Sequence, residues 1–131
     1  MLGAISDRLV LRQDGPAVHY SDFMFQHREA ANFPWISQAQ WLYTQMVRWD
    51  RMEYDPADAA RAAVFRPDIY RSALRGADSP LPGASSKVEG AVKGMIGAST
   101  EQGHLVMELD AFFDGKTFDP EQLEEYLASQ S

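Results

Sequence analysis

The stretch NFPWISQAQWLYTQMVRW, residues 32–49, decides the fold of this chain. Pro34 excludes helix before it, and Ser37 can cap a helix because its hydroxyl accepts a first-turn backbone N–H that has no other partner. The sequence therefore predicts a helix from Gln38 to Trp49. Its apolar side chains recur at helical spacing and are expected to face the core: Ala39, Leu42, Tyr43, Met46 and Val47.

Two further helices are predicted to start at prolines. Pro56, capped by Asp55, begins an alanine-rich helix that ends near Phe65. A shorter helix covers Pro67–Leu74 and is closed by Gly76. Because small side chains permit close approach, the two helices are expected to form an αα-hairpin.

The last part of the chain carries strand, turn and helix-start signals. His104–Leu109 predicts a strand, and Asp114-Gly115 between two aromatic segments favours a type I′ hairpin. Asp119 followed by Pro120 is typical of the cap and first position of a helix. A capped C-terminal helix is therefore expected.

These elements predict a single domain-sized unit, residues 1–131, of the helix-rich α+β class. Residues 1–36 are expected to be extended chain and loop, with one or two short strands around the Asp14-Gly15-Pro16 turn. Residues 37–76 form the helical core, and the Gly/Pro/Ser-rich residues 77–103 are expected to be mobile. Residues 104–131 hold the strand, the hairpin and the final helix.

Composition excludes several classes of function. The net charge of −7 opposes broad binding to nucleic acid phosphates. The chain has no cysteine, which excludes disulfides and thiolate chemistry. It has no apolar run long enough for a membrane span, and residues 1–12 lack the pattern of an export signal.

No catalytic or metal-binding motif is visible, and no cofactor is expected. The histidines, His19, His27 and His104, do not have metal-ligand spacing. A nucleophile–base pair and a phosphate-binding glycine loop are also missing. An enzyme is therefore not predicted.

Two residues are candidates for binding an anion. Lys87, with Ser85 and Ser86 at the start of a short expected helix, can combine backbone N–H groups with an ammonium. His27, beside Phe25, is the other candidate. Each has a structural alternative, a helix cap for the serines and a hydrogen-bonded core position for the histidine.

Aromatic side chains are concentrated between Phe23 and Trp49. Interleaved with arginines they could stack nucleic acid bases. The acidic net charge opposes that reading, and helical spacing favours a core or a face that a partner covers.

The same segment carries a family resemblance. Four blocks occur in the order found in the C-terminal portion of nitrate-, nitrite- and bicarbonate-binding proteins of ABC importers: Phe25-Gln26-His27, residues 32–49, Arg66–Arg71, and residues 112–120 with Glu125-Tyr126-Leu127. The chain resembles that family, which is of the periplasmic-binding-protein type II kind. Its motif residues are expected to serve packing: Asn32, Phe33, Pro34, Trp35, Trp41, Arg48 and Trp49.

The resemblance implies a part of a larger protein. Family members are two-lobed α/β proteins that close on a small oxyanion, and their C-terminal part packs helices onto the first lobe. The implied partners are nitrate, nitrite or bicarbonate in the full-length context, the remaining lobe, and the membrane subunits of the transporter. The aromatic face could also mediate homo-oligomerisation.

Two interpretations of the chain stay open. As part of an exported protein it is expected in the periplasm, where it would not be a complete binder by itself. As a whole gene product it is expected in the cytoplasm, as a free-standing anion-sensing or protein-interaction module.

Overall fold

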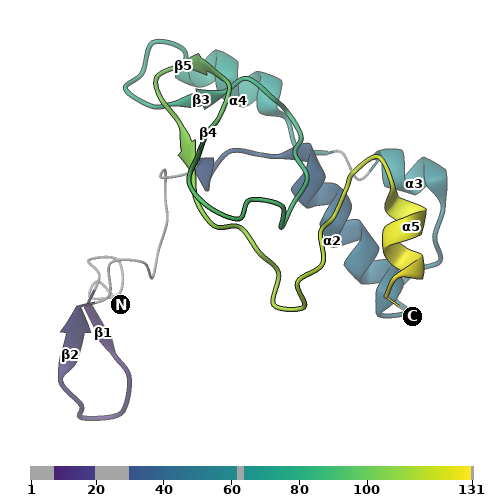
Figure 1. The fold of residues 1–131 in the computed structure, drawn as a ribbon, viewed down its shortest axis with the longest axis horizontal. Helices are drawn as coiled ribbons and strands as arrows, with labels where there is room; N and C mark the ends of the chain where they lie inside the picture. The colour runs from purple at the N-terminus through teal and green to yellow at the C-terminus, as the bar shows by residue number, and fades with distance from the viewer. Residues whose placement is uncertain (1–7, 20–29, 62–63, 131) are drawn as a thin grey trace.

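The computed structural model describes residues 8–19, 30–61 and 64–130. Within these ranges the chain is a mixed fold of four helices, α2 to α5, and six short strands in three two-stranded antiparallel sheets. Figure 1 shows α2 crossing the middle of the fold, with α3 and α5 beside its C-terminal half and α4 near β3 and β5. None of these helices is long and apolar enough to cross a membrane.

Strands β1 (Arg8–Val10) and β2 (Ala17–His19) form a hairpin, with Leu9 opposite Val18. In the turn, the Gly15 N–H donates to the Arg12 carbonyl oxygen at 3.0 Å. The short strands predicted around this turn are confirmed. All their side chains are exposed or half-buried, so the hairpin contributes nothing to the buried core.

Helix α2 (Ile36–Arg48) is the long helix that the sequence predicts, and it begins slightly earlier than expected. Ser37 is not its cap, because Trp35 occupies that position and provides no side-chain hydrogen bond. The Ile36 N–H donates instead to the carbonyl oxygen of Ser85 at 3.0 Å. A backbone acceptor from a distant loop therefore replaces the predicted side-chain cap.

Helices α3 (Pro56–Arg61) and α4 (Pro67–Leu74) begin at the two predicted prolines. Asp55 Oδ1 accepts a hydrogen bond from the Ala57 N–H at 2.7 Å, as expected of a cap. The predicted αα-hairpin is wrong. Among the described residues α3 packs on α2, whereas α4 lies beside β3 and β5 (Figure 1).

Arg71 explains why α4 lies there. Its side chain is buried and donates to carbonyl oxygens at the end of β3 and in the loop after it: Nε to Pro82 at 2.7 Å, and Nη2 to Gly83 at 3.2 Å and to Ala84. Its guanidinium also lies 5.0 Å from the ring centroid of Phe33. This one side chain ties α4 to the loop and to the core.

Residues 77–103 hold β3 (Leu81–Pro82), β4 (Ile96–Gly97) and β5 (Thr100–Gln102). Strand β5 pairs with β3, and β4 pairs with β6 (Val106–Met107), which lies within the predicted strand. No helix starts at Lys87, because the backbone of Glu89 pairs with that of Phe118 in an isolated bridge. The mobility of this segment stays a prediction.

The C-terminal segment contains a turn but not the predicted hairpin. The Gly115 N–H donates to the Phe112 carbonyl oxygen at 3.0 Å, yet the flanking residues do not pair with each other, since Phe118 pairs with Glu89. Asp119 Oδ1 accepts from the Glu121 N–H at 2.9 Å in a further turn. Helix α5 (Leu123–Ala128) starts only after it, so the expected start at Asp119 and Pro120 is wrong.

The buried residues form two clusters. The first holds Ala30, Phe33, Trp35, Leu105 and Met107, and the second holds Tyr43, Ala59, Phe118, Leu123 and Tyr126. Trp35 directly precedes α2, whereas Tyr43 lies within the helix. Helix α2 thus connects the two clusters.

Gly90 is expected to tolerate no side chain. Its φ is +76°, and an added Cβ would lie 2.9 Å from both the Lys116 carbonyl oxygen and a ring carbon of Phe112. We expect Gly90→Ala to lower the free energy of unfolding by about 2–3 kcal/mol, since backbone strain and overpacking act together. Chemical denaturation measures this. Gly94→Ala is the control, because a Cβ at Gly94 meets open space and its φ is not positive; equal losses for both variants would contradict the expectation.

Candidate interaction site on helix α2

The inner side of α2 is largely polar. Ser37 and Thr44 are fully buried, and Gln45 is nearly so. The Ser37 hydroxyl donates to Glu89 Oε1 at 2.6 Å, and Gln45 Nε2 donates to the Tyr126 hydroxyl at 3.4 Å. Because buried polar groups need such partners, these bonds select which side of the helix faces inward.

The outer side of α2 is apolar and exposed. Leu42, Met46 and Trp49, here called the outer stripe, expose 51%, 44% and 62% of their surface. Their spacing makes them neighbours along one face of the helix. The prediction that Leu42 and Met46 face the core is wrong, because the hydrogen-bonded polar side chains occupy the inner side. Ala39 and Tyr43 are buried as expected.

A lysine between two carboxylates lies beside the first turn of α2. Lys87 Nζ contacts Glu89 Oε2 and lies 2.6 Å from Asp110 Oδ2. The Glu89 side chain is only 7% exposed, and Asp110 Oδ2 also accepts from the Gly90 N–H at 3.3 Å. These three side chains, here called the carboxylate cluster, carry two negative charges and one positive charge.

The positive charge of the cluster is stable at neutral pH. Burial lowers the pKa of Lys87, but the hydrogen bonds and charges of Asp110 and Glu89 outweigh that effect and raise the pKa overall. The ammonium also lies 5.9 Å from the ring centroid of Trp35. Its charge is therefore engaged within the protein, and binding of an anion by Lys87 stays a prediction.

A groove of about 340 Å³ separates α2 from the segment around Phe112. The rings of Trp41 and Phe112 stack in it, with centroids 5.2 Å apart and planes at 11°. Trp41 Nε1 donates to the Tyr126 hydroxyl at 3.1 Å, which fixes the orientation of the indole. The groove is lined by Gln38, Trp41, Leu42, Glu89, Asp110 and Phe112. It shares Leu42 with the outer stripe, so groove and stripe form one continuous surface.

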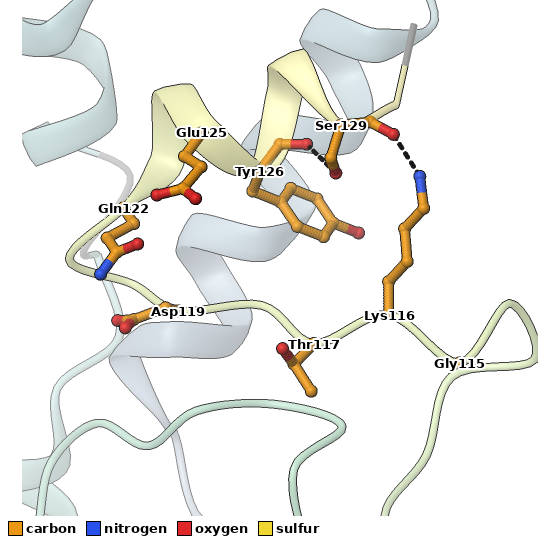
Figure 2. Close-up of a pocket in the computed structure, with 8 residues that line it drawn as sticks. All are labelled: Gly115, Lys116, Thr117, Asp119, Gln122, Glu125, Tyr126 and Ser129. Carbon is orange, nitrogen blue, oxygen red and sulfur yellow. Dashed lines mark hydrogen bonds between the residues drawn. The ribbon is translucent and has the colours of Figure 1, made fainter.

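A second pocket, of about 360 Å³, lies between residues 115–119 and α5 (Figure 2). Lys116 Nζ reaches the Ser129 carbonyl oxygen at one end, while Asp119 and Glu125 border the other. The pocket is completed by Gly115, Thr117, Gln122 and Tyr126. Two carboxylates and the carbonyl end of a helix repel negative charge, so this pocket is unfavourable for an anion.

The residues predicted to pack divide between core and surface. Phe33, Pro34, Trp35 and Trp41 are buried or half-buried, whereas Asn32, Arg48 and Trp49 are exposed. His27 lies outside the described residues, as does Phe25. Sequence reasoning missed Glu89 and Asp110, because no local spacing links two acidic residues that a long-range backbone arrangement brings together.

Three curated proteins are similar to this chain over most of its length. The nitrate/nitrite binding protein NrtA of Synechococcus elongatus is 30% identical over 121 residues, or 87% of the chain. The proteins of that name from Synechocystis and Nostoc are 31% identical over 103 residues (76% of the chain) and 30% identical over 114 residues (80%). Over most of its own length the chain is thus similar to nitrate/nitrite binding proteins. The resemblance to this family that the sequence predicts is thereby confirmed.

The chain spans about a fifth of each nitrate/nitrite binding protein that it matches: 22%, 19% and 21% of their lengths. No family model matches the chain, and no solved structure matches it. The relatives are binding proteins by name, in agreement with the lack of a catalytic motif in the sequence.

Proposed function

We propose that the chain forms the C-terminal part of a nitrate/nitrite substrate-binding protein of the ABC-importer kind, in which α2 packs against the rest of that protein. Helix α2 carries this proposal through its exposed apolar side. Its inner side is satisfied by hydrogen bonds, while Leu42, Met46 and Trp49 face outward. A helix of this kind is suited to a place between two layers, with the second layer covering the apolar stripe.

In this proposal the anion is bound by residues elsewhere in the longer protein, in the periplasm. Several cationic side chains of the described chain are held by its own oxygen atoms. Arg71 is held by backbone carbonyls, Lys87 by two carboxylates, and Arg66 by Asp68 at 2.6 Å. Such engaged cations offer little attraction to an incoming oxyanion.

The first test is self-association of the isolated chain. An uncovered apolar stripe is expected to bring copies together, so sedimentation should give a mass above the 14.7 kDa of one chain that rises with concentration. Leu42→Gln combined with Trp49→Gln should restore the single-chain mass. Ile69→Gln is the control, because Ile69 is also exposed on a helix but lies on α4. A chain that stays monomeric at all concentrations would remove the support for this packing surface.

Calorimetry with nitrate distinguishes the free-standing sensor module from this proposal. A module that binds the anion by itself should give a heat of binding and a higher melting temperature with millimolar nitrate, since a ligand of the folded state stabilises it. We expect neither effect for the isolated chain. Saturable binding of nitrate would favour the sensor module instead.

A further inference from the structure

The groove next to the outer stripe has an unbalanced charge. The carboxylate cluster has two carboxylates but only Lys87 to neutralise them, and Lys87 is protonated at neutral pH. Both carboxylates line the groove, but the Glu89 side chain is only 7% exposed, whereas that of Asp110 is 32% exposed. Both hydrogen bonds that Asp110 accepts through its carboxylate reach Oδ2, so among the described residues Oδ1 has no partner. The groove therefore offers one carboxylate oxygen and one uncompensated negative charge.

The other walls of the groove suit the stem and the planar head of a long cationic side chain. Trp41 and Phe112 present stacked aromatic rings, and aromatic rings attract guanidinium and ammonium groups. Leu42 and the side chain of Gln38 complete the wall on α2. Such a wall can cover the methylene groups of an arginine while its charge reaches the carboxylate.

We propose that the groove receives an arginine or lysine of a partner polypeptide, and that the apolar side chains next to this residue in the partner cover the outer stripe. This rests on the proposed function, in which α2 packs against the rest of a longer protein. Charge complementarity selects this occupant. A second copy of the chain fits the groove less well than a basic segment does, because the chain is itself acidic, with a net charge of −7. The partner segment is therefore basic and amphipathic.

A matched pair of peptides tests the proposal on the chain as it is. One is the acetylated and amidated peptide Leu-Ala-Arg-Ala-Leu, and the other carries citrulline, the neutral isostere of arginine, at its centre. Titrations are followed by NMR at the indole N–H signals of Trp41 and Trp49. Because a hydrogen bond to a charged group is stronger than a neutral one, we expect about tenfold weaker binding of the citrulline peptide.

The Asp110→Asn variant provides the second arm. It removes the uncompensated charge while keeping the shape of the groove. The ratio of the affinities for the arginine and citrulline peptides should therefore fall to near one. Asp78→Asn is the control, since Asp78 is an exposed aspartate outside the groove. Circular dichroism verifies that the variants are folded. The comparison of the two peptides on the unaltered chain does not depend on whether the variants fold.

The outcomes separate this inference from the proposed function. Equal binding of both peptides would overturn the charge recognition, while the outer stripe would still be a packing surface. If butylguanidinium binds as tightly as the arginine peptide, the groove is a site for small cations, and the proposal of a polypeptide partner is overturned. If neither peptide binds and the chain self-associates, and if Asp110→Asn abolishes this self-association, the occupant of the groove is a second copy of the chain. No binding of either peptide to a strictly monomeric chain would contradict both proposals.

Discussion

Replacement of Arg71 by methionine is expected to lower the free energy of unfolding by about 3–5 kcal/mol, because it leaves several carbonyl oxygens without their charged donor, at about 1–3 kcal/mol for each buried unsatisfied group. The guanidinium is buried and supplies the donors for the carbonyl oxygens of Pro82, Gly83 and Ala84. Methionine keeps the apolar stem but leaves these oxygens without partners, and unsatisfied buried acceptors are costly. Urea denaturation followed by circular dichroism gives the value.

Arg66→Met is the matched control for Arg71→Met. Arg66 comes from the same short segment and forms a bidentate pair with Asp68, at 2.8 and 2.6 Å, but each side chain of this pair is 61% exposed. The hydrogen bond from Arg66 lowers the pKa of Asp68 to about 2. Solvent screens exposed pairs, so we expect no measurable change in stability. If the two variants lost equal stability, the buried network would not be the reason for the effect at Arg71.

The second large effect is expected at Lys87. Lys87→Met should lower the free energy of unfolding by about 3 kcal/mol, because it leaves the enclosed carboxylate of Glu89 without its cation. Since the pKa of Lys87 is raised in the folded chain, the stabilisation is present at neutral pH and is lost only as the pH rises through the raised value. Thermal and chemical unfolding of the variant at neutral pH measure the loss.

A double variant tests whether the loss at Lys87 comes from an unpaired charge. Lys87→Met combined with Glu89→Gln removes both charges of the closer pair, while the amide oxygen can still accept from Ser37. The double variant should recover part of the stability that the single variant loses. Additive losses would show that Lys87 and Glu89 act independently and would contradict this account of the cluster.

Local sequence signals predicted the starts of α3 and α4 well. Pro56 and Pro67 each begin a helix, because proline lacks the N–H that the first helical position leaves unpaired anyway. The Asp14-Gly15 turn also lies where expected, with Asp14 at φ 57°. Such signals act over a few residues and depend little on the rest of the fold.

Signals that compete with long-range pairing were less informative. Asp119 and Pro120 form a turn rather than the start of α5, because Gln122 has a non-helical backbone (φ −132°, ψ 50°). The Phe118 backbone is held by two hydrogen bonds of 2.9 Å to Glu89. No local rule anticipates this pairing of residues 89 and 118.

The orientation of α2 could not be read from hydrophobicity either. An amphipathic pattern favours Leu42 and Met46 for the inner side, since apolar side chains usually face the core. The partners that reverse this choice, Glu89 and Tyr126, lie far along the chain from the helix. The candidate site was therefore predictable as an aromatic packing segment but not as a groove with a carboxylate wall.

The hydrogen bonds on the inner side of α2 have a consequence for the entropy of assembly. Because Ser37 and Gln45 are bonded to Glu89 and Tyr126, the helix cannot rotate about its axis when its outer side is uncovered. Trp41 is likewise held through its Nε1. A partner thus meets a helix face that is already oriented, and association loses less conformational freedom than it would if α2 were ordered only by the partner.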